Sequence, residues 1–357
     1  MMKRELYRAT NLPVLQNRTF ADADSAKHSA SADIILVQDE ASGLIFNDAF
    51  DADKLSYDSD YQNEQAHSSQ FQQHLADVEA IISRHFKGQN LIEVGCGKGY
   101  FLEMLKGVGY AIIGIDPAYE GDNPSVIKAA FSPELGLSAD ALVLRHVLEH
   151  IKDPINFLAS IAEANKGGLI YIEVPCFDWI IEHRAWFDVF YEHVNYFRLD
   201  DLHRFFGTVL ESGHVFGGQY LYMVADLSTL RVMPEKPGSL INIPSEFSGS
   251  LRRAVKIILD APLQGSAIWG ASSKGVIYSL FLQRAGVTVD QVVDINPSKQ
   301  GRYLPLSGVR VSSPEEAMAV LPDGANLFVM NSNYLEEIKR MTDERYVYHA
   351  VDSASFQ

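Results

Sequence analysis

Two ionisable residues, Glu192 and His193, stand side by side in the aromatic segment WFDVFYEHVNYF. Aromatic neighbours withhold water from a carboxylate and raise its pKa, and an adjacent imidazole can share its proton. Such a pair suits a general base that works near neutral pH. A Glu–His pair on the surface of an aromatic helix would give the same residues, so the segment alone leaves both interpretations open.

A Gly-rich turn, residues 95–99, lies between the apolar stretch 91–94 and a helical stretch that begins at Tyr100. Glycines there let a ligand approach the backbone, and the amides at the helix start point toward that ligand. Asp116 ends the next apolar stretch, 21 residues after Gly95, where an acid can accept hydrogen bonds from ribose hydroxyls. The turn predicts a nucleoside site, with a plain structural turn as the alternative.

The spacing of these glycines distinguishes a dinucleotide site from a SAM site. A dinucleotide fingerprint, G-x-G-x-x-G, would need its third glycine at Tyr100, whereas this sequence has G-x-G-x-G with Glu93 two residues ahead of it. The pattern resembles motif I of class I methyltransferases, which use S-adenosylmethionine (SAM). The resemblance implies that SAM is the cofactor and that it is bound by Glu93, Gly95, Cys96, Gly97, Gly99, Asp116 and Pro117.

The segment RHVLEHIKDP follows the apolar stretch 141–144. It resembles the sequence after the fourth strand of many class I methyltransferases, and ligands bind at the carboxyl ends of strands in open α/β sheets. Arg145 and His146 are therefore expected beside the cofactor. His146 is a candidate for the methyl-transfer site, with a histidine held by backbone groups as the alternative. Glu149 and His150 are expected to be structural caps.

The aromatic segment resembles the YHEH--YF motif of a family of C-methyltransferases that modify nucleotide-linked keto sugars. In that family the Glu and His of the motif are implicated in removing a proton from carbon next to a ketone, which would assign this role to Glu192 and His193. Phe190 occupies the position of the family's tyrosine, and Tyr191, one residue on, is a further catalytic candidate. The segment FGGQYL keeps the glycines of the family's HGGSLR but not its His, Ser and Arg.

A second turn, WGASSKG, precedes a helical stretch in the C-terminal part, and Asp294 ends the following apolar stretch, 24 residues after Gly270. It predicts a second nucleotide-binding turn in which a helix start and Lys274 hold a phosphate, with a Rossmann-like unit kept for packing as the alternative. Residues 292–305 and 326–339 resemble the C-terminal domain of the same family, which closes over the sugar-nucleotide acceptor. On that resemblance the substrate-binding candidates are Lys274, Lys299, Arg302 and Asn331.

These sites need a scaffold that brings strand ends together. Apolar stretches alternate with helical stretches from residue 91 to residue 174, which predicts a parallel sheet with helices on both faces. The expected fold class is α/β: a Rossmann-like class I methyltransferase domain over 61–230, a second Rossmann-like domain over 231–357, and a small N-terminal lobe over 1–60 that is irregular or forms a strand pair. An amphipathic helix is expected over 61–86.

Composition limits the partners. The formal net charge of −16 disfavours phosphate backbones and anionic lipids, and no apolar run is long enough for a membrane span, so neither nucleic acid nor membrane is expected. The only cysteines, Cys96 and Cys176, fit a reducing cytoplasm. Residues 38–46 resemble half of the family's four-cysteine zinc module with its cysteines replaced, so no metal is expected. Homo-oligomerisation is compatible with these features.

The preferred hypothesis is SAM-dependent methyl transfer to a small polar acceptor, a nucleotide-linked sugar or a polysaccharide precursor, with Glu192 or His193 as general base. Methylation of carbon is favoured over methylation of a sugar hydroxyl, which the same residues could perform. Two further hypotheses stay open: an NAD-linked oxidoreductase that uses the turn at Gly270, and a non-catalytic nucleotide-binding protein.

Overall fold

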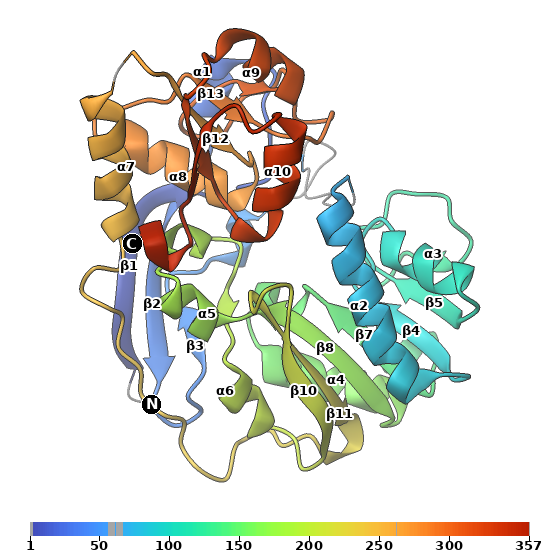
Figure 1. Ribbon diagram of the computed structural model, residues 1–357. Helices are drawn as coiled ribbons and strands as arrows, with labels where there is room; N and C mark the ends of the chain where they lie inside the picture. Colours follow the sequence, from blue (N-terminus) through green and yellow to red (C-terminus); the bar gives the residue numbers. More distant parts are fainter. Residues whose placement is uncertain (1–2, 56–60, 62–66, 262, 357) are drawn as a thin grey trace.

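The computed structural model describes residues 3–55, 61, 67–261 and 263–356, which form three sheets flanked by helices (Figure 1). The first sheet has four strands in the order β1-β2-β3-β9. Its strands are β1 (Lys3–Pro13), β2 (Ser31–Asp39), β3 (Ile45–Asn47) and β9 (Asn195–Tyr196). The last of these comes from the aromatic segment, so the N-terminal lobe and that segment share one sheet.

The second sheet has seven strands in the order β10-β11-β8-β7-β4-β5-β6. Its bounds are β4 (Asn90–Val94), β5 (Ala111–Ile115), β6 (Val126–Ile127), β7 (Ala141–Arg145), β8 (Leu169–Pro175), β10 (Val209–Val215) and β11 (Tyr220–Asp226). Strands β4 to β8 run parallel, while β11 is antiparallel to both of its neighbours. The chain order reverses at β4, which pairs with β5 on one side and β7 on the other, and ligands bind at such switch points.

The third sheet has five parallel strands in the order β14-β13-β12-β15-β16. Its bounds are β12 (Ser266–Trp269), β13 (Gln291–Val293), β14 (Val311–Ser312), β15 (Asn326–Val329) and β16 (Val347–Ala350). Its order reverses at β12, between β13 and β15. The molecule therefore has one mixed sheet with a parallel core and one fully parallel sheet, each with its own switch point.

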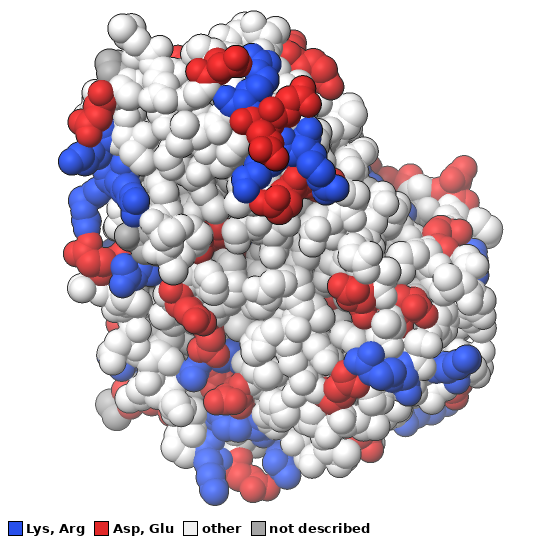
Figure 2. All heavy atoms as spheres, in the orientation of Figure 1, with Lys and Arg blue, Asp and Glu red and all other residues white. Residues whose placement is uncertain are grey.

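The helices cover these sheets. Their bounds are α1 (Ala23–Lys27), α2 (Ser69–Phe86), α3 (Tyr100–Gly107), α4 (Pro154–Asn165), α5 (Phe177–Glu182), α6 (Leu199–His203), α7 (Gly249–Asp260), α8 (Ser273–Arg284), α9 (Pro314–Val320) and α10 (Leu335–Met341). No helix among the described residues is both long enough and apolar enough to cross a bilayer. On the face shown in Figure 2, acidic and basic side chains are interspersed over the described residues.

The alternation of side chains along the parallel strands builds two apolar layers. In β4, Leu91 belongs to the same buried cluster as Val78 and Ile82 of α2, whereas Ile92 belongs to a separate cluster that includes Leu158 of α4. Because both faces are covered, the strands are mostly apolar, which is why they stand out in the sequence.

Most expected elements are present, with one correction. Within the described residues the helix that leads into β4 begins at Ser69, capped by Ser68, and residues 62–66 of the expected helix lie outside the described part. The N-terminal lobe takes the second of its two expected forms, because β1 and β2 pair as a long antiparallel ribbon, and β3 and β9 extend that pair to four strands. Residues 231–248, where a boundary was expected, contain no helix or strand and run beside the first sheet, where Gln38 Nε2 donates to the Ser239 carbonyl at 2.9 Å.

Candidate active site

One cavity of about 420 Å³ lies where the two switch points face each other. On one side it is lined by the turn after β4 and the turn after β7, and on the other by the turns after β12 and β15. The start of α2, the end of β8 and His193 complete the wall. The sequence predicted two nucleotide-binding turns in separate domains, at Gly95 and at Gly270. In the structure both turns line the same cavity.

The first glycine turn has the geometry of a ligand cradle. Gly95, Gly97 and Gly99 all have positive φ angles of 54–80°. A Cβ on Gly95 would lie 2.3 Å from Cγ2 of Val147, so only glycine fits there, whereas a Cβ on Gly97 would meet open space. Gly95, Cys96 and Gly97 line the cavity, while Gly99 is the N-cap residue of α3 and does not line it.

Asp116 closes the turn from the neighbouring strand. Its Oδ2 accepts a hydrogen bond from the Gly97 amide at 2.8 Å, and its Oδ1 accepts one from the Ala118 amide at 2.8 Å. The carboxylate is half-buried at the end of β5 and next to the cavity wall, whereas Pro117 is exposed and does not line the cavity.

Glu93 gives the clearest test of whether the cradle fits SAM. Its carboxyl is buried and lines the cavity, and its Oε2 has no hydrogen-bond partner among the described residues. Burial raises the pKa of Glu93 to about 8, Asp116 adds to the rise, and Arg145 opposes it. An orphaned carboxyl oxygen beside an open glycine turn fits the ammonium group of a nucleoside with an amino-acid tail.

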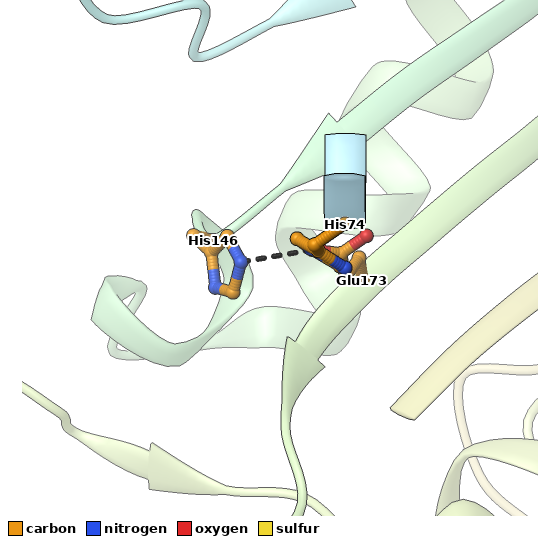
Figure 3. Close-up of side chains that lie close together, drawn as sticks. All are labelled: His74, His146 and Glu173. Carbon is orange, nitrogen blue, oxygen red and sulfur yellow. Dashed lines mark hydrogen bonds and ion pairs between the residues drawn. The ribbon is translucent and has the colours of Figure 1, made fainter. Parts of the chain in front are cut away.

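His146 belongs to a buried charged network at the end of β7 and β8 (Figure 3). Oε1 of Glu173 accepts hydrogen bonds from Nε2 of His74 at 3.0 Å and from Nε2 of His146 at 2.9 Å. Arg145 donates to the same carboxylate at 3.1 Å, and the Tyr171 hydroxyl donates to its Oε2 at 2.7 Å.

The charges of this network are fixed by its contacts. Burial acts against ionisation of Glu173, but Arg145 and the two histidines hold the pKa of that carboxyl well below its usual value. Burial also opposes the charge on His146, yet hydrogen bonds to Glu149 and Glu173 raise its pKa to about 9. His146 is therefore an imidazolium at neutral pH, and both of its ring nitrogens face carboxylates.

His193 faces the cavity as a neutral imidazole. Burial, together with the positive charges of His150, His146 and Lys274, holds the pKa of His193 well below its usual value. Glu149 and His150, which the sequence suggested as structural caps, also line the cavity, and both contact the backbone of residues 192–194.

The neighbours of His193 in the chain are placed differently. Glu192 is fully buried, does not line the cavity, and accepts a hydrogen bond from the Gln16 amide at 2.8 Å. Burial raises the pKa of its carboxyl, against the effects of His150 and of hydrogen bonds from Gln16 and Tyr61. Tyr191 is also buried away from the cavity, where its hydroxyl accepts from the Asp51 amide at 2.8 Å. The structure brings only His193 of the three to the cavity.

Two of the four substrate candidates line the cavity. Lys274 does so at the start of α8, with Nζ 3.0 Å from Oδ2 of Asp188, and Asn331 donates to Oε1 of Gln219 at 2.7 Å. Lys299 is buried outside the cavity lining and donates to the Ser272 hydroxyl at 2.5 Å. It therefore holds the turn after β12 and does not face the cavity. Arg302 donates to the Thr19 hydroxyl at 2.8 Å and joins the N-terminal lobe to the third sheet.

Some cavity residues escaped the sequence analysis. Asn17 lines the cavity from the N-terminal lobe and donates to the Ser273 hydroxyl at 3.1 Å, and Tyr61 also lines it. Nothing in the local sequence indicates these contacts. His74 did leave a signal, since it lies on the apolar stripe of α2 between Phe71 and Val78, where a polar residue needs a buried partner.

Comparisons with known proteins agree with this architecture. Residues 64–208 match the family described as a methyltransferase domain, and residues 245–349 match the C-methyltransferase C-terminal domain. The chain is 25% identical over 294 residues to the C-methyltransferase NovU of Streptomyces niveus, across 70% of this chain and 68% of that protein.

Shorter and more distant similarities were also found. A stretch of 104 residues is 30% identical to the mitochondrial ubiquinone biosynthesis O-methyltransferase of Homo sapiens, across 24% of this chain and 28% of that protein. Among solved structures, magnesium protoporphyrin IX methyltransferase from Synechocystis PCC 6803 with bound SAM is 15% identical, with a TM-score of 0.32, across 44% of this chain and 79% of that chain.

Proposed function

We propose that this chain, a SAM-dependent methyltransferase with a C-methyltransferase C-terminal domain, methylates carbon next to a ketone in a nucleotide-linked sugar or related polysaccharide precursor. The observation that carries the proposal is the shared cavity onto which two Rossmann-type turns open. One turn suits the cofactor, and the other suits the nucleotide part of the acceptor. The two domain matches favour methyl transfer over an NAD-linked oxidation or a non-catalytic role.

The cofactor belongs at the first turn. Glu93 would hold the ammonium of its amino-acid tail, the amides of residues 95–97 would face it, and Asp116 would accept from its ribose hydroxyls. When bound, SAM would supply an electrophilic methyl group, whose transfer converts the sulfonium into a neutral thioether.

The acceptor belongs at the second turn. The amides at the start of α8, the hydroxyls of Ser272 and Ser273, and Lys274 all line this side of the cavity. Backbone amides at a helix start and an ammonium group bind phosphate, so this side suits a nucleoside diphosphate. We assign this role to the unit 231–357, with Asn331 as a further polar contact.

His193 is the group best suited to remove the proton. Its pKa is held low by burial and nearby positive charge, so the ring is neutral at physiological pH and can accept a proton. Glu192 is less suited because its carboxyl lies outside the cavity wall and binds the Gln16 amide. We therefore assign the base to His193 and a supporting role to Glu192.

Isotope exchange tests this assignment. The full-length enzyme, incubated in D₂O without SAM and with a panel of nucleoside-diphosphate keto sugars, is expected to place deuterium on the carbon next to the ketone. His193→Gln is expected to slow this exchange by roughly 100-fold or more, since general-base catalysis contributes that much. The exposed His28→Gln is the matched control and is expected to exchange at the wild-type rate. Wild-type exchange by a folded His193→Gln variant would rule out His193 as the base.

Methylation of oxygen is the second candidate, favoured by the partial match to ubiquinone biosynthesis O-methyltransferases. The two outcomes differ in the bond formed. With ¹³C-methyl SAM, NMR of the product distinguishes a methyl on carbon from a methyl on oxygen. An O-methyl product without deuterium exchange would replace the carbon assignment and leave the enzyme class unchanged.

A further inference from the structure

We propose that Glu149 is a positioning residue whose carboxylate is the counter-ion of His193 once His193 has taken up the acceptor's proton. The inference rests on the proposed function, because it concerns the partner of the base in that reaction. Glu192, the acid next to His193 in the chain, is the partner that the sequence favours. The structure points instead to Glu149, which follows β7 and lies 44 residues before His193 in the chain.

Glu149 has a buried carboxylate with one oxygen left over. The residue is 1% exposed, yet it lines the cavity. Its Oε1 lies 3.4 Å from Nδ1 of His146, while its Oε2 has no hydrogen-bond partner among the described residues. An unpartnered carboxylate oxygen in a buried position is costly, so it points to a donor that arrives during the reaction cycle.

The histidines around this oxygen are the candidate donors. One carboxylate oxygen of Glu149, one ring nitrogen of His150 and one ring nitrogen of His193 all lie within 4.8 Å of one another. Nδ1 of His150 lies 2.9 Å from the carbonyl oxygen of Glu192. Because a carbonyl only accepts, Nδ1 of His150 carries a hydrogen that is already committed to the Glu192 carbonyl. His193 gains an N–H when it is protonated, which makes it the donor that the cycle creates.

The surrounding charges make a counter-ion necessary. His146 and His150 after β7, and Lys274 at the start of α8, each disfavour a positive charge on His193. Of the other acids nearby, Glu173 binds Arg145 and His146, and Asp188 pairs with Lys274. Glu192 does not line the cavity and accepts from the Gln16 amide. A second positive charge in this buried space is stabilised only where a carboxylate faces it.

The step is a simple proton transfer. A C–H bond next to the ketone breaks, its electron pair stays on the acceptor as an enolate, and an N–H bond forms on His193. The imidazolium then pairs with Glu149, while His146 holds the other side of that carboxylate. The arrangement follows the logic of an acid that orients a catalytic histidine and stabilises its charged form.

The experiment is the SAM-free deuterium exchange of Glu149→Gln, measured as a function of pH. Exchange at pH 7.5 is expected to fall roughly 10- to 100-fold, as is typical when a supporting partner is removed. The acid limb of the pH–rate profile is expected to move to lower pH, because the protonated His193 loses its carboxylate and its pKa falls. Glu149→Asp should restore part of the rate. Exposed Glu163→Gln, on α4, is the control and should match the wild type.

Three outcomes would overturn or redirect the inference. A slower Glu149→Gln with an unmoved acid limb and a lower melting temperature would mean that Glu149 has only a structural role. An unchanged rate and profile in a folded Glu149→Gln variant would remove Glu149 from the mechanism while leaving His193 as base. Loss of wild-type exchange with EDTA and its return with a divalent ion would make Glu149, His150 and His193 metal ligands. Failure of the proposed function is distinct, since the wild type would then show no exchange, or a folded His193→Gln variant would exchange at the wild-type rate.

Discussion

Nζ of Lys274 lies 3.0 Å from Oδ2 of Asp188 and 4.9 Å from the centre of the Trp179 ring. Lys274 lies in the first turn of α8, next to the third sheet, whereas Asp188 and Trp179 belong to the aromatic region after β8. Both ionic side chains are largely buried, at 12% and 7% exposure. The pair therefore joins the two sides of the cavity at the point where the acceptor is expected to bind.

Substitution of Lys274 should test two roles of this ion pair, its contribution to stability and its part in binding the acceptor. Lys274→Met leaves Asp188 buried without its partner, which is expected to lower the free energy of unfolding by about 3–5 kcal/mol, measured by urea denaturation. Lys274→Met with Asp188→Asn should recover most of that loss, because no unpaired charge remains. If Lys274 also binds the acceptor's phosphate, the double variant should keep SAM affinity and show a raised KM for the acceptor. A double variant with wild-type KM would exclude Lys274 from acceptor binding.

Asp116 should act on the cofactor alone. Asp116→Ala removes the acceptor of the Gly97 amide and the acid placed for ribose hydroxyls, so SAM affinity should fall by roughly tenfold or more, about 1.4 kcal/mol. Calorimetric titration measures the affinity, and turnover at saturating SAM should remain within a few fold of wild type. Exposed Asp122→Ala is the matched control. Wild-type SAM affinity in Asp116→Ala would show that the cofactor does not use this carboxylate.

The sequence predicted the parts of the site that follow buried strands. The turn at Gly95, the acid Asp116 and the residues after β7 were found because parallel strands covered on both faces are continuous apolar runs, and the polar residues that end them stand out. The alternation of strands and helices and the existence of a second Rossmann-like unit were predicted on the same basis and on family resemblance.

The rest depends on contacts between distant segments. Whether Glu192 or His193 faces the cavity is decided by the Gln16 amide, which holds the Glu192 carboxylate from the N-terminal lobe. Lys299 and Arg302 have the residue type of phosphate ligands, but Ser272 and Thr19 accept their hydrogen bonds. Contacts between residues so far apart in the chain leave no local pattern, so they could not be foreseen from the sequence.

Glu93 should couple stability and cofactor binding to pH. Its carboxyl has an ordinary pKa of 4.5, and burial raises the pKa in the folded protein to about 8. Below pH 4.5 both states are protonated. Between pH 4.5 and 8 the unfolded chain loses its proton first, so the folded state is destabilised by up to about 1.4 kcal/mol per pH unit. Glu93→Gln cannot ionise at this position. Its free energy of unfolding should therefore fall less than that of the wild type as the pH rises from 4.5 to 8.

SAM binding should strengthen with rising pH, whereas the stability of the free protein falls over the same range. An ammonium group is held by the ionised carboxylate, so binding below pH 8 should release a proton and tighten as the pH rises toward 8, by up to about tenfold per unit. Calorimetry in two buffers with different heats of ionisation measures the released proton directly. Glu93→Gln should bind SAM more weakly and without this release, whereas the exposed Glu163→Gln should behave like the wild type. Equal binding heats in both buffers at pH 7 would mean that Glu93 stays protonated and that the tail of the cofactor is held by another group.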